Sequence, residues 1–205
     1  MLTLFYSPGA CSMAPHIVLE ETGEAYEAKR VDFSKSEQKS ETYLQINPLG
    51  RVPALILDDG TPLAENTAIL PYLGKRFGLW PTDPIAEAKA LSLIGFLASS
   101  VHPAHAHSRR PERYATDEAA FPTIREVGRK SFVTYLGWID ARLAGREWVL
   151  ERYSVLDAYT LVFYSWGLRY HDLPMTEFKH YTAFRDRMLE RPAVRRVVED
   201  EKVKV

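Results

Sequence analysis

The only cysteine of this 205-residue chain, Cys11, lies where a strand is predicted to pass into a helix. Residues 2–7 read as a buried strand, residues 8–10 form a turn, and the apolar pattern after Cys11 indicates a helix. Backbone N–H groups at a helix start are unpaired and carry partial positive charge, which favours a thiolate over a thiol. Cys11 is therefore a candidate reactive residue; a small buried apolar side chain is the equally good alternative.

Two further segments place polar groups at the boundaries of predicted elements. Pro53 begins an apolar strand although it lacks an N–H for the ladder. If the Val52–Pro53 bond is cis, the Val52 main chain can pair with a bound peptide; a trans proline at a strand boundary is the alternative. Glu65 and Asn66 open a helix, where they either cap its N–H groups or, with those groups, hold the ammonium and carboxylate of an amino acid.

Three histidines follow one another at residues 102, 105 and 107. Zinc is one interpretation, but Pro103 disturbs the helical spacing and no cysteine or carboxylate joins the cluster locally. We therefore predict no metal site and expect these rings to line a cleft or a subunit contact. Ser154 and Asp157 match a capping box before an apolar run, to which we assign a structural role only.

The bulk properties exclude several classes of protein. With 46% hydrophobic and 26% charged residues and a net charge of −1, the chain has an ordinary soluble composition and no reason to bind nucleic acid or an anionic membrane. A single cysteine cannot form an internal disulfide. No signal peptide is evident, and no apolar run approaches the roughly 20 residues that span a bilayer. A cytoplasmic location is expected.

The pattern of elements changes near residue 80 and predicts two domains. Residues 1–79 alternate between strands and helices, whereas residues 80–86, rich in proline, indicate a linker. Residues 87–205 show helical periodicity, with an irregular or kinked stretch expected at residues 102–122. The expected strands cover residues 2–7, 26–32, 52–57 and 61–64, and the main later helices cover residues 85–101, 124–143, 155–170, 181–189 and 193–198.

Four stretches together resemble the glutathione transferase family. The first, residues 4–12, looks like the bacterial beta class specifically; the others are Asn-Pro-Leu-Gly-Arg-Val-Pro-Ala-Leu at residues 47–55, residues 63–73, and residues 153–159 around the capping box. Each is weak alone, but four in the right order with fitting spacing are a strong match. Departures are Asn66, where serine is usual, and Gly95, where the beta class has an asparagine that contacts the tripeptide.

The resemblance implies a fold, a substrate and a site. It implies an α/β thioredoxin-like N-terminal domain with a mixed four-stranded sheet, an all-α C-terminal domain, a homodimer, and glutathione as co-substrate. It further implies that Pro53 is cis, that Cys11 can form a mixed disulfide with glutathione, and that the remaining glutathione-binding residues are Lys35, Arg51, Val52, Glu65, Asn66 and His102.

The same resemblance implies an enzyme that conjugates glutathione to small hydrophobic electrophiles, and that also serves in thiol transfer or peroxide reduction through Cys11. Cys11, Ser12 or Tyr6 would donate to the glutathione thiolate, although Tyr6 also suits the core. Residues His105, Tyr114, Trp166 and Tyr170 would wall the electrophile pocket, although aromatic side chains at helical spacing also suit a core. A non-catalytic ligand-binding scaffold and a glutathione-dependent isomerase or dehalogenase are the alternatives.

Overall fold

A computed structural model describes all residues 1–205. The N-terminal part contains β1 (Leu2–Tyr6), α1 (Met13–Thr22), β2 (Tyr26–Arg30), the short 3-10 turns η1 (Phe33–Lys35) and η2 (Glu37–Lys39), α2 (Glu41–Ile46), β3 (Ala54–Ile56), β4 (Pro62–Ala64) and α3 (Asn66–Arg76). The strands form one sheet in the order β2-β1-β3-β4, in which only β1 and β2 are parallel. The mixed four-stranded sheet expected from the sequence is confirmed.

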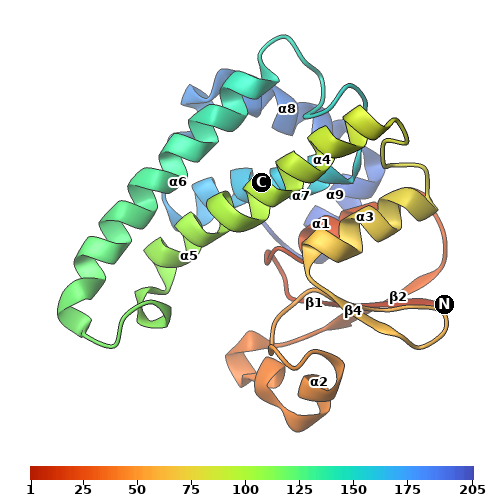
Figure 1. Cartoon of the computed structure of the whole chain (residues 1–205), viewed down its shortest axis with the longest axis horizontal. Coiled ribbons are helices and arrows are strands. Elements are labelled where there is room, and N and C mark those ends of the chain that lie inside the picture. Colours follow the sequence, from red (N-terminus) through yellow and green to blue (C-terminus); the bar gives the residue numbers. More distant parts are fainter.

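The alternation of side chains along β1 explains the layers of this part. Leu2 and Leu4 point to the same face and are buried. Figure 1 shows α1 and α3 together on one side of the sheet and α2 on the other. Pro62 lies in β4 at the edge of the sheet, where its missing N–H removes no bond to a second neighbour.

The C-terminal part is helical. It contains α4 (Pro84–Phe96), a π-helical turn η3 (Leu97–Val101), α5 (His102–Arg109), α6 (Phe121–Leu143), α7 (Val155–Tyr170), α8 (Lys179–Glu190) and α9 (Pro192–Asp200), with short 3-10 turns η4 (Pro111–Arg113), η5 (Glu118–Ala120) and η6 (Met175–Glu177). All residues of α7 up to Gly167 are buried, so this helix forms the centre of the molecule.

Two sequence expectations are corrected here. The irregular or kinked stretch expected at residues 102–122 is confirmed only for residues 110–120, which contain η4 and η5. Residues 102–109 are helical instead, because the π-helical turn shifts the hydrogen-bond register just before Pro103, which has no N–H to offer. The linker is also shorter than expected. Asp83 accepts hydrogen bonds from two N–H groups of the next turn, so α4 begins at Pro84.

The helical run Pro84–Arg109 is more apolar than inspection of the sequence indicated. It has 26 residues, and its best 18-residue window has a mean hydropathy of 1.3, of which 28% is buried. By length and composition alone, this one helix would be able to cross a membrane, a criterion that core helices of soluble proteins also meet. The expectation that no apolar run approaches the length of a membrane span is therefore wrong when helix length and mean hydropathy are the criteria.

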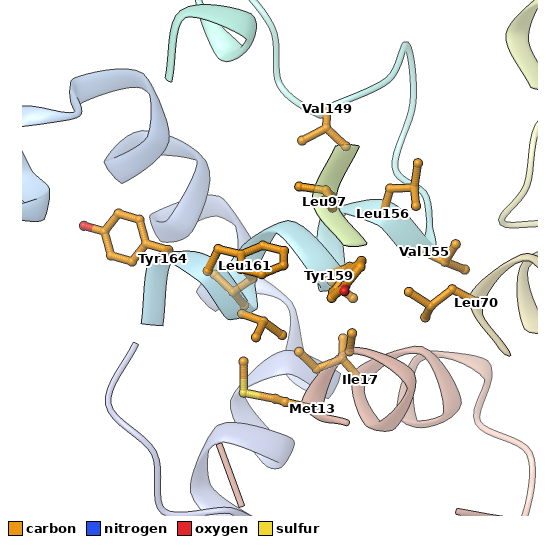
Figure 2. Close-up of a cluster of buried hydrophobic side chains, with 14 of the residues drawn as sticks. Met13, Ile17, Leu70, Leu97, Val149, Val155, Leu156, Tyr159, Leu161 and Tyr164 are labelled. Carbon is orange, nitrogen blue, oxygen red and sulfur yellow. The ribbon is translucent and has the colours of Figure 1, made fainter. Parts of the chain in front are cut away.

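One hydrophobic core joins the two parts. Met13 and Ile17 of α1 and Leu70 of α3 pack with Val155 and Tyr159 of α7 (Figure 2). The helices next to the sheet thus bury their outer faces against the centre of the helical part. Because α1 and α3 both begin at the edge where Cys11 lies, the helical part fixes the positions of those two helix starts.

Candidate functional site

The loop between β1 and α1 is closed by the Ser12 side chain. The Ser12 hydroxyl accepts a hydrogen bond from the Ser7 N–H at 3.1 Å and donates one to the Ser7 carbonyl at 3.2 Å, and the residue is fully buried. Both hydrogen-bonding functions of this hydroxyl are therefore committed to the loop. The structure assigns Ser12 to holding Cys11 in place, and offers no free hydroxyl at this position for a bound thiolate.

Cys11 lies one residue before the N-cap of α1 and is partly accessible. Its Sγ donates a hydrogen bond to the Val52 carbonyl at 3.4 Å. Burial raises the pKa of the Cys11 thiol to about 12, and the Glu65 carboxylate adds to this effect, whereas Arg110 opposes it. The expectation that the helix start favours a thiolate is therefore wrong for this structure, because loss of solvent outweighs the partial charges of the helix end.

The segment before β3 presents its main chain to Cys11. The Val52–Pro53 bond is cis, as the sequence match implied. The Arg51 carbonyl accepts hydrogen bonds from the Tyr43 hydroxyl at 2.6 Å and from the Asn47 side-chain amide at 2.7 Å, which fixes the strand entry. The Val52 N–H makes no hydrogen bond within the chain. A main-chain donor and the carbonyl that holds the Cys11 thiol are thus next to one another.

The start of α3 lies on the other side of Cys11. Asn66 is buried and donates from Nδ2 to the Cys11 carbonyl at 3.0 Å, while its Oδ1 has no hydrogen-bond partner. Glu65 is exposed, has a φ of +70° and a ψ of 129°, and makes no side-chain capping bond. This φ is uncommon for a residue with a side chain and stores strain. Capping, the simpler interpretation of this pair, is therefore not what the two side chains do.

The helical part holds the loop before Cys11. The Gly9 N–H donates to the Glu201 carboxylate at 2.7 Å, and the Gly9 carbonyl accepts from the Trp166 indole at 2.9 Å and from Arg169 at 3.3 Å. Gly9 has a φ of +67°, and a Cβ there would collide with the Arg169 guanidinium. His16 Nδ1 lies 2.8 Å from the same Glu201 carboxylate. Residues more than 150 positions away thus fix this turn.

Two residues expected to wall an electrophile pocket lie in the core instead. Trp166 is 4% exposed because its indole N–H is bonded to Gly9 and its ring stacks on His105 at 4.1 Å. His105 is 5% exposed, its Nδ1 lies 3.0 Å from Nε2 of His171, and burial lowers its pKa to about 2. The expected pocket roles of His105 and Trp166 are therefore wrong; both support the site from behind.

Three further residues expected at the glutathione site differ in their surroundings: His102 and Tyr6 pack against other rings, and Lys35 is exposed. His102 packs edge-on against Trp166 at 5.0 Å, and burial, followed by Arg110 and Arg51, lowers its pKa to about 4. Tyr6 packs on His16 with ring centroids 4.8 Å apart, which favours the core alternative over a donor at Cys11. Lys35 is exposed in η1, 3.9 Å from Asp32.

Tyr114 and Tyr170 are accessible to solvent and therefore remain candidates for the wall of the electrophile pocket. Tyr114 is 45% exposed and stacks on His107 at 3.7 Å. Tyr170 is partly buried, with the Arg109 guanidinium over its ring at 5.3 Å. Within the chain, no group of three or more His, Cys, Asp or Glu side chains is placed to hold a metal ion.

Two residues near Cys11 went unnoticed in the sequence. The Nε of Arg110 is buried and has no hydrogen-bond partner. Burial lowers the pKa of the Arg110 guanidinium, and the nearby charge of Arg113 lowers it further, whereas Cys11 raises it. Burial raises the pKa of Tyr159 on α7 well above its usual value; Cys11 adds to the shift and the Asn66 side chain opposes it. Tyr159 is buried on α7, which packs against α1 and α3. The only sequence signal for Arg110 is its position between a helix end and Pro111.

Comparison with known proteins decides the family. Residues 1–75 match the model of the glutathione S-transferase N-terminal domain. The chain is 34% identical to glutathione S-transferase GstA of Escherichia coli O157:H7, over 99% of this chain and 100% of that protein. The chain belongs to the glutathione transferase family. It is a glutathione transferase with a thioredoxin-like N-terminal domain and a helical remainder.

Solved structures agree with this assignment. A glutathione transferase homologue from Sulfitobacter, determined with bound glutathione, is 35% identical, superposes with a TM-score of 0.91, and is matched over 100% of this chain and 99% of that chain. A bacterial beta class glutathione S-transferase from Sphingomonas chungbukensis is 33% identical with a TM-score of 0.84, over 97% of this chain and 98% of that chain. This transferase is therefore similar to the beta class in both sequence and fold.

Proposed function

We propose that this transferase binds glutathione along the groove formed by Cys11, Val52 and the start of α3, and joins its sulfur to small hydrophobic electrophiles in a detoxification reaction. The observation that carries the proposal is the convergence of three segments on one residue: Cys11 bonds Val52 through its thiol and Asn66 through its carbonyl. Around this contact lie a free main-chain N–H, a buried amide oxygen and an exposed carboxylate. These are the partners that a tripeptide with an amino-acid head requires.

Each part of glutathione has a proposed partner. The Val52 N–H and C=O pair with the cysteinyl main chain, as an added strand would. Glu65 accepts from the α-ammonium of the γ-glutamyl end, whose carboxylate lies at the start of α3 beside Asn66. Lys35, Arg51 and His102 complete the proposed contacts, His102 as a neutral ring because its pKa of about 4 leaves it uncharged at pH 7.

Cys11 is proposed to act as a hydrogen-bond donor. With a pKa of about 12 it is protonated at neutral pH, and its proton is held by the Val52 carbonyl. When the cysteinyl N–H of glutathione takes that carbonyl, the thiol is released and can donate to the glutathione sulfur. The Arg110 and Arg51 guanidinium groups, which favour the thiolate form of Cys11, would favour the thiolate of glutathione for the same electrostatic reason. Thiol transfer through Cys11 is then the weaker activity.

The electrophile is proposed to lie between Cys11 and the helical part, against Tyr114 and Tyr170. We further propose a cytoplasmic homodimer with domains at residues 1–79 and 87–205. Exposed apolar side chains that a second copy would cover support this assembly: Leu49, Leu91 and Val127. Sedimentation equilibrium tests the dimer directly, since a monomer at micromolar concentration contradicts it.

Replacement of Cys11 by alanine tests the proposed role of its thiol. We expect Cys11→Ala to retain conjugation of 1-chloro-2,4-dinitrobenzene, with kcat lowered about tenfold by loss of one donor to the thiolate. Thiol transfer to 2-hydroxyethyl disulfide should vanish. A matched Cys11→Ser variant, which keeps a donor, should recover part of the conjugation rate. Equal loss in both variants would contradict the donor role, and no binding of glutathione by the wild type in calorimetry would contradict the proposed function itself.

A further inference from the structure

Two arginine side chains lie on Tyr170, one of the aromatic residues proposed to wall the electrophile pocket. The guanidinium of Arg109, in the last turn of α5, lies 5.3 Å from the centroid of the Tyr170 ring, and that of Arg169 lies 4.8 Å from it. Both distances are within the range of a cation–π contact. An aromatic wall with two cations on it favours a ligand that combines a flat ring with negative charge.

Arg169 joins this aromatic wall to the loop that carries Cys11. Its Nη1 donates to the Gly9 carbonyl at 3.3 Å, and its Nη2 donates to the Tyr170 hydroxyl at 3.1 Å. Gly9 stands two residues before Cys11, on which the proposed glutathione groove is centred. One guanidinium thus holds Tyr170 next to the Cys11 loop, on the side where the electrophile is proposed to bind.

Arg109 has no counter-charge within the chain. The residue is exposed, and neither Arg109 nor Arg169 forms an ion pair with a carboxylate. The excess of positive charge is local, because the whole chain has a net charge of −1. His171 adds no charge to it, because burial lowers its pKa to about 4, and Arg109 and Arg129 lower it further. A carboxylate from a bound molecule would therefore be the first counter-charge of Arg109.

A structural role of Arg109 is the alternative. A cation in the last turn of a helix interacts favourably with the partial negative charge of the helix end, and that interaction needs no ligand. The two roles predict different kinetics. A structural contribution would change the conjugation of all electrophiles alike, whereas a carboxylate partner would change only that of anionic electrophiles.

Resting on the proposed conjugation reaction, we propose that this transferase prefers aromatic electrophiles with a carboxylate, whose ring lies on Tyr170 and whose carboxylate binds Arg109. Glutathione has its own proposed partners in the groove, so Arg109 remains for the electrophile. The carboxylate lies across the ring from the carbon that glutathione attacks. At that carbon a C–S bond forms and the leaving group departs with its electron pair, while the thiol proton passes to water. Arg109 is then a specificity-determining residue that contacts the substrate away from the reacting atoms.

Two matched electrophiles test the proposal: 4-chloro-3,5-dinitrobenzoate and its neutral amide, 4-chloro-3,5-dinitrobenzamide. Each kcat/KM is divided by the rate constant of the uncatalysed reaction with glutathione, which removes the difference in intrinsic reactivity. We expect the wild type to favour the benzoate about tenfold on this measure, and added salt to reduce the preference. Conjugation of the amide without a preference for the benzoate would overturn this proposal and leave the proposed function intact. Conjugation of neither would contradict the proposed function itself.

Replacement of Arg109 locates the carboxylate. Arg109→Gln should raise the KM for the benzoate about tenfold with little change in kcat, because a contact remote from the reacting carbon is equally strong in the ground and transition states. Arg109→Lys keeps the charge but loses the planar fork, so it should recover part of the preference for the benzoate. The matched control is Arg125→Gln, which removes an exposed arginine whose guanidinium lies 5.8 Å from the Phe121 centroid. This control should keep the wild-type preference.

Three results would overturn the role of Arg109. An equal rise in the KM for both electrophiles in Arg109→Gln would assign the residue to the structure of the helix end. A rise in the KM for glutathione alone would assign it to glutathione. The same loss of preference in Arg125→Gln would show that the preference comes from the overall charge of the helical part.

Discussion

Two helices of this chain begin in opposite ways. At the start of α7, the Ser154 hydroxyl accepts from the Leu156 N–H, and the Asp157 carboxylate accepts from the N–H groups of Ser154 and Val149 at 2.8 and 2.9 Å. At the start of α3, by contrast, no side chain caps the helix, the preceding residue has a positive φ, and a buried amide oxygen has no partner.

The two helix starts differ in whether their polar groups are satisfied within the chain. The polar groups of α7 are satisfied inside the protein, so they stabilise the fold and leave nothing to bind a ligand. Those of α3 are strained or unpaired, an arrangement that costs stability and is typical of a functional site. Both starts have carboxylate and amide or hydroxyl side chains, so residue type alone does not distinguish them.

Loss of the capping box at the start of α7 should have the largest effect on the free energy of unfolding. Asp157→Ala leaves the buried N–H groups of Ser154 and Val149 without an acceptor, and we expect it to lower the free energy of unfolding by about 3 kcal/mol. Asn66→Ala at α3 should lower it by only about 1 kcal/mol, since one hydrogen bond is lost, but should raise the KM for glutathione. Urea unfolding and steady-state kinetics measure both. Similar stability losses would remove the contrast between the two helix starts.

Acid should weaken the contact between α5 and α7 through His102, whose ring packs on Phe163 and Trp166. The folded pKa of His102, about 4, lies below the unfolded value near 6.5, so its contribution to stability is complete above pH 6.5 and is lost as the pH falls toward 4. Between pH 7 and 5, the wild type should lose about 1 kcal/mol more than His102→Phe, whose ring can keep the contacts with Trp166 and Phe163. Burial raises the pKa of Asp157 to about 7, which acts in the opposite direction, so the difference between the two proteins is the quantity to measure. Parallel pH profiles would contradict this role of burial.

The smallest expected effect concerns strain at α3. Glu65→Gly removes the penalty of a φ of +70° and should raise the free energy of unfolding by about 1 kcal/mol, while the KM for glutathione rises about tenfold through loss of the carboxylate. The matched variant Glu65→Gln keeps the strain and loses only the charge, so its stability should equal that of the wild type. If glycine and glutamine give equal stability, the start of α3 is not strained.

Much of the fold was predictable because its elements are specified by local patterns. The strands at residues 2–6 and 26–30, the edge position of Pro62 and the helix after Ser154 follow from apolar alternation, the missing proline N–H and a capping box. The π-helical turn before Pro103 was not predicted, because the proline indicates a disturbed helix and does not say whether the helix ends there or continues with a shifted register.

The sequence by itself identified the residues that we propose to bind glutathione: Cys11, Val52, Glu65 and Asn66 lie at element boundaries that the chain order and the family match identify. Only the tertiary structure decided their chemical states. Glu201, Trp166 and Arg169 fix the loop at Gly9 from more than 150 residues away, and burial makes Cys11 a thiol. The reason is that capping and periodicity act over a few residues, whereas desolvation and long-range hydrogen bonds depend on what the rest of the chain packs against the site.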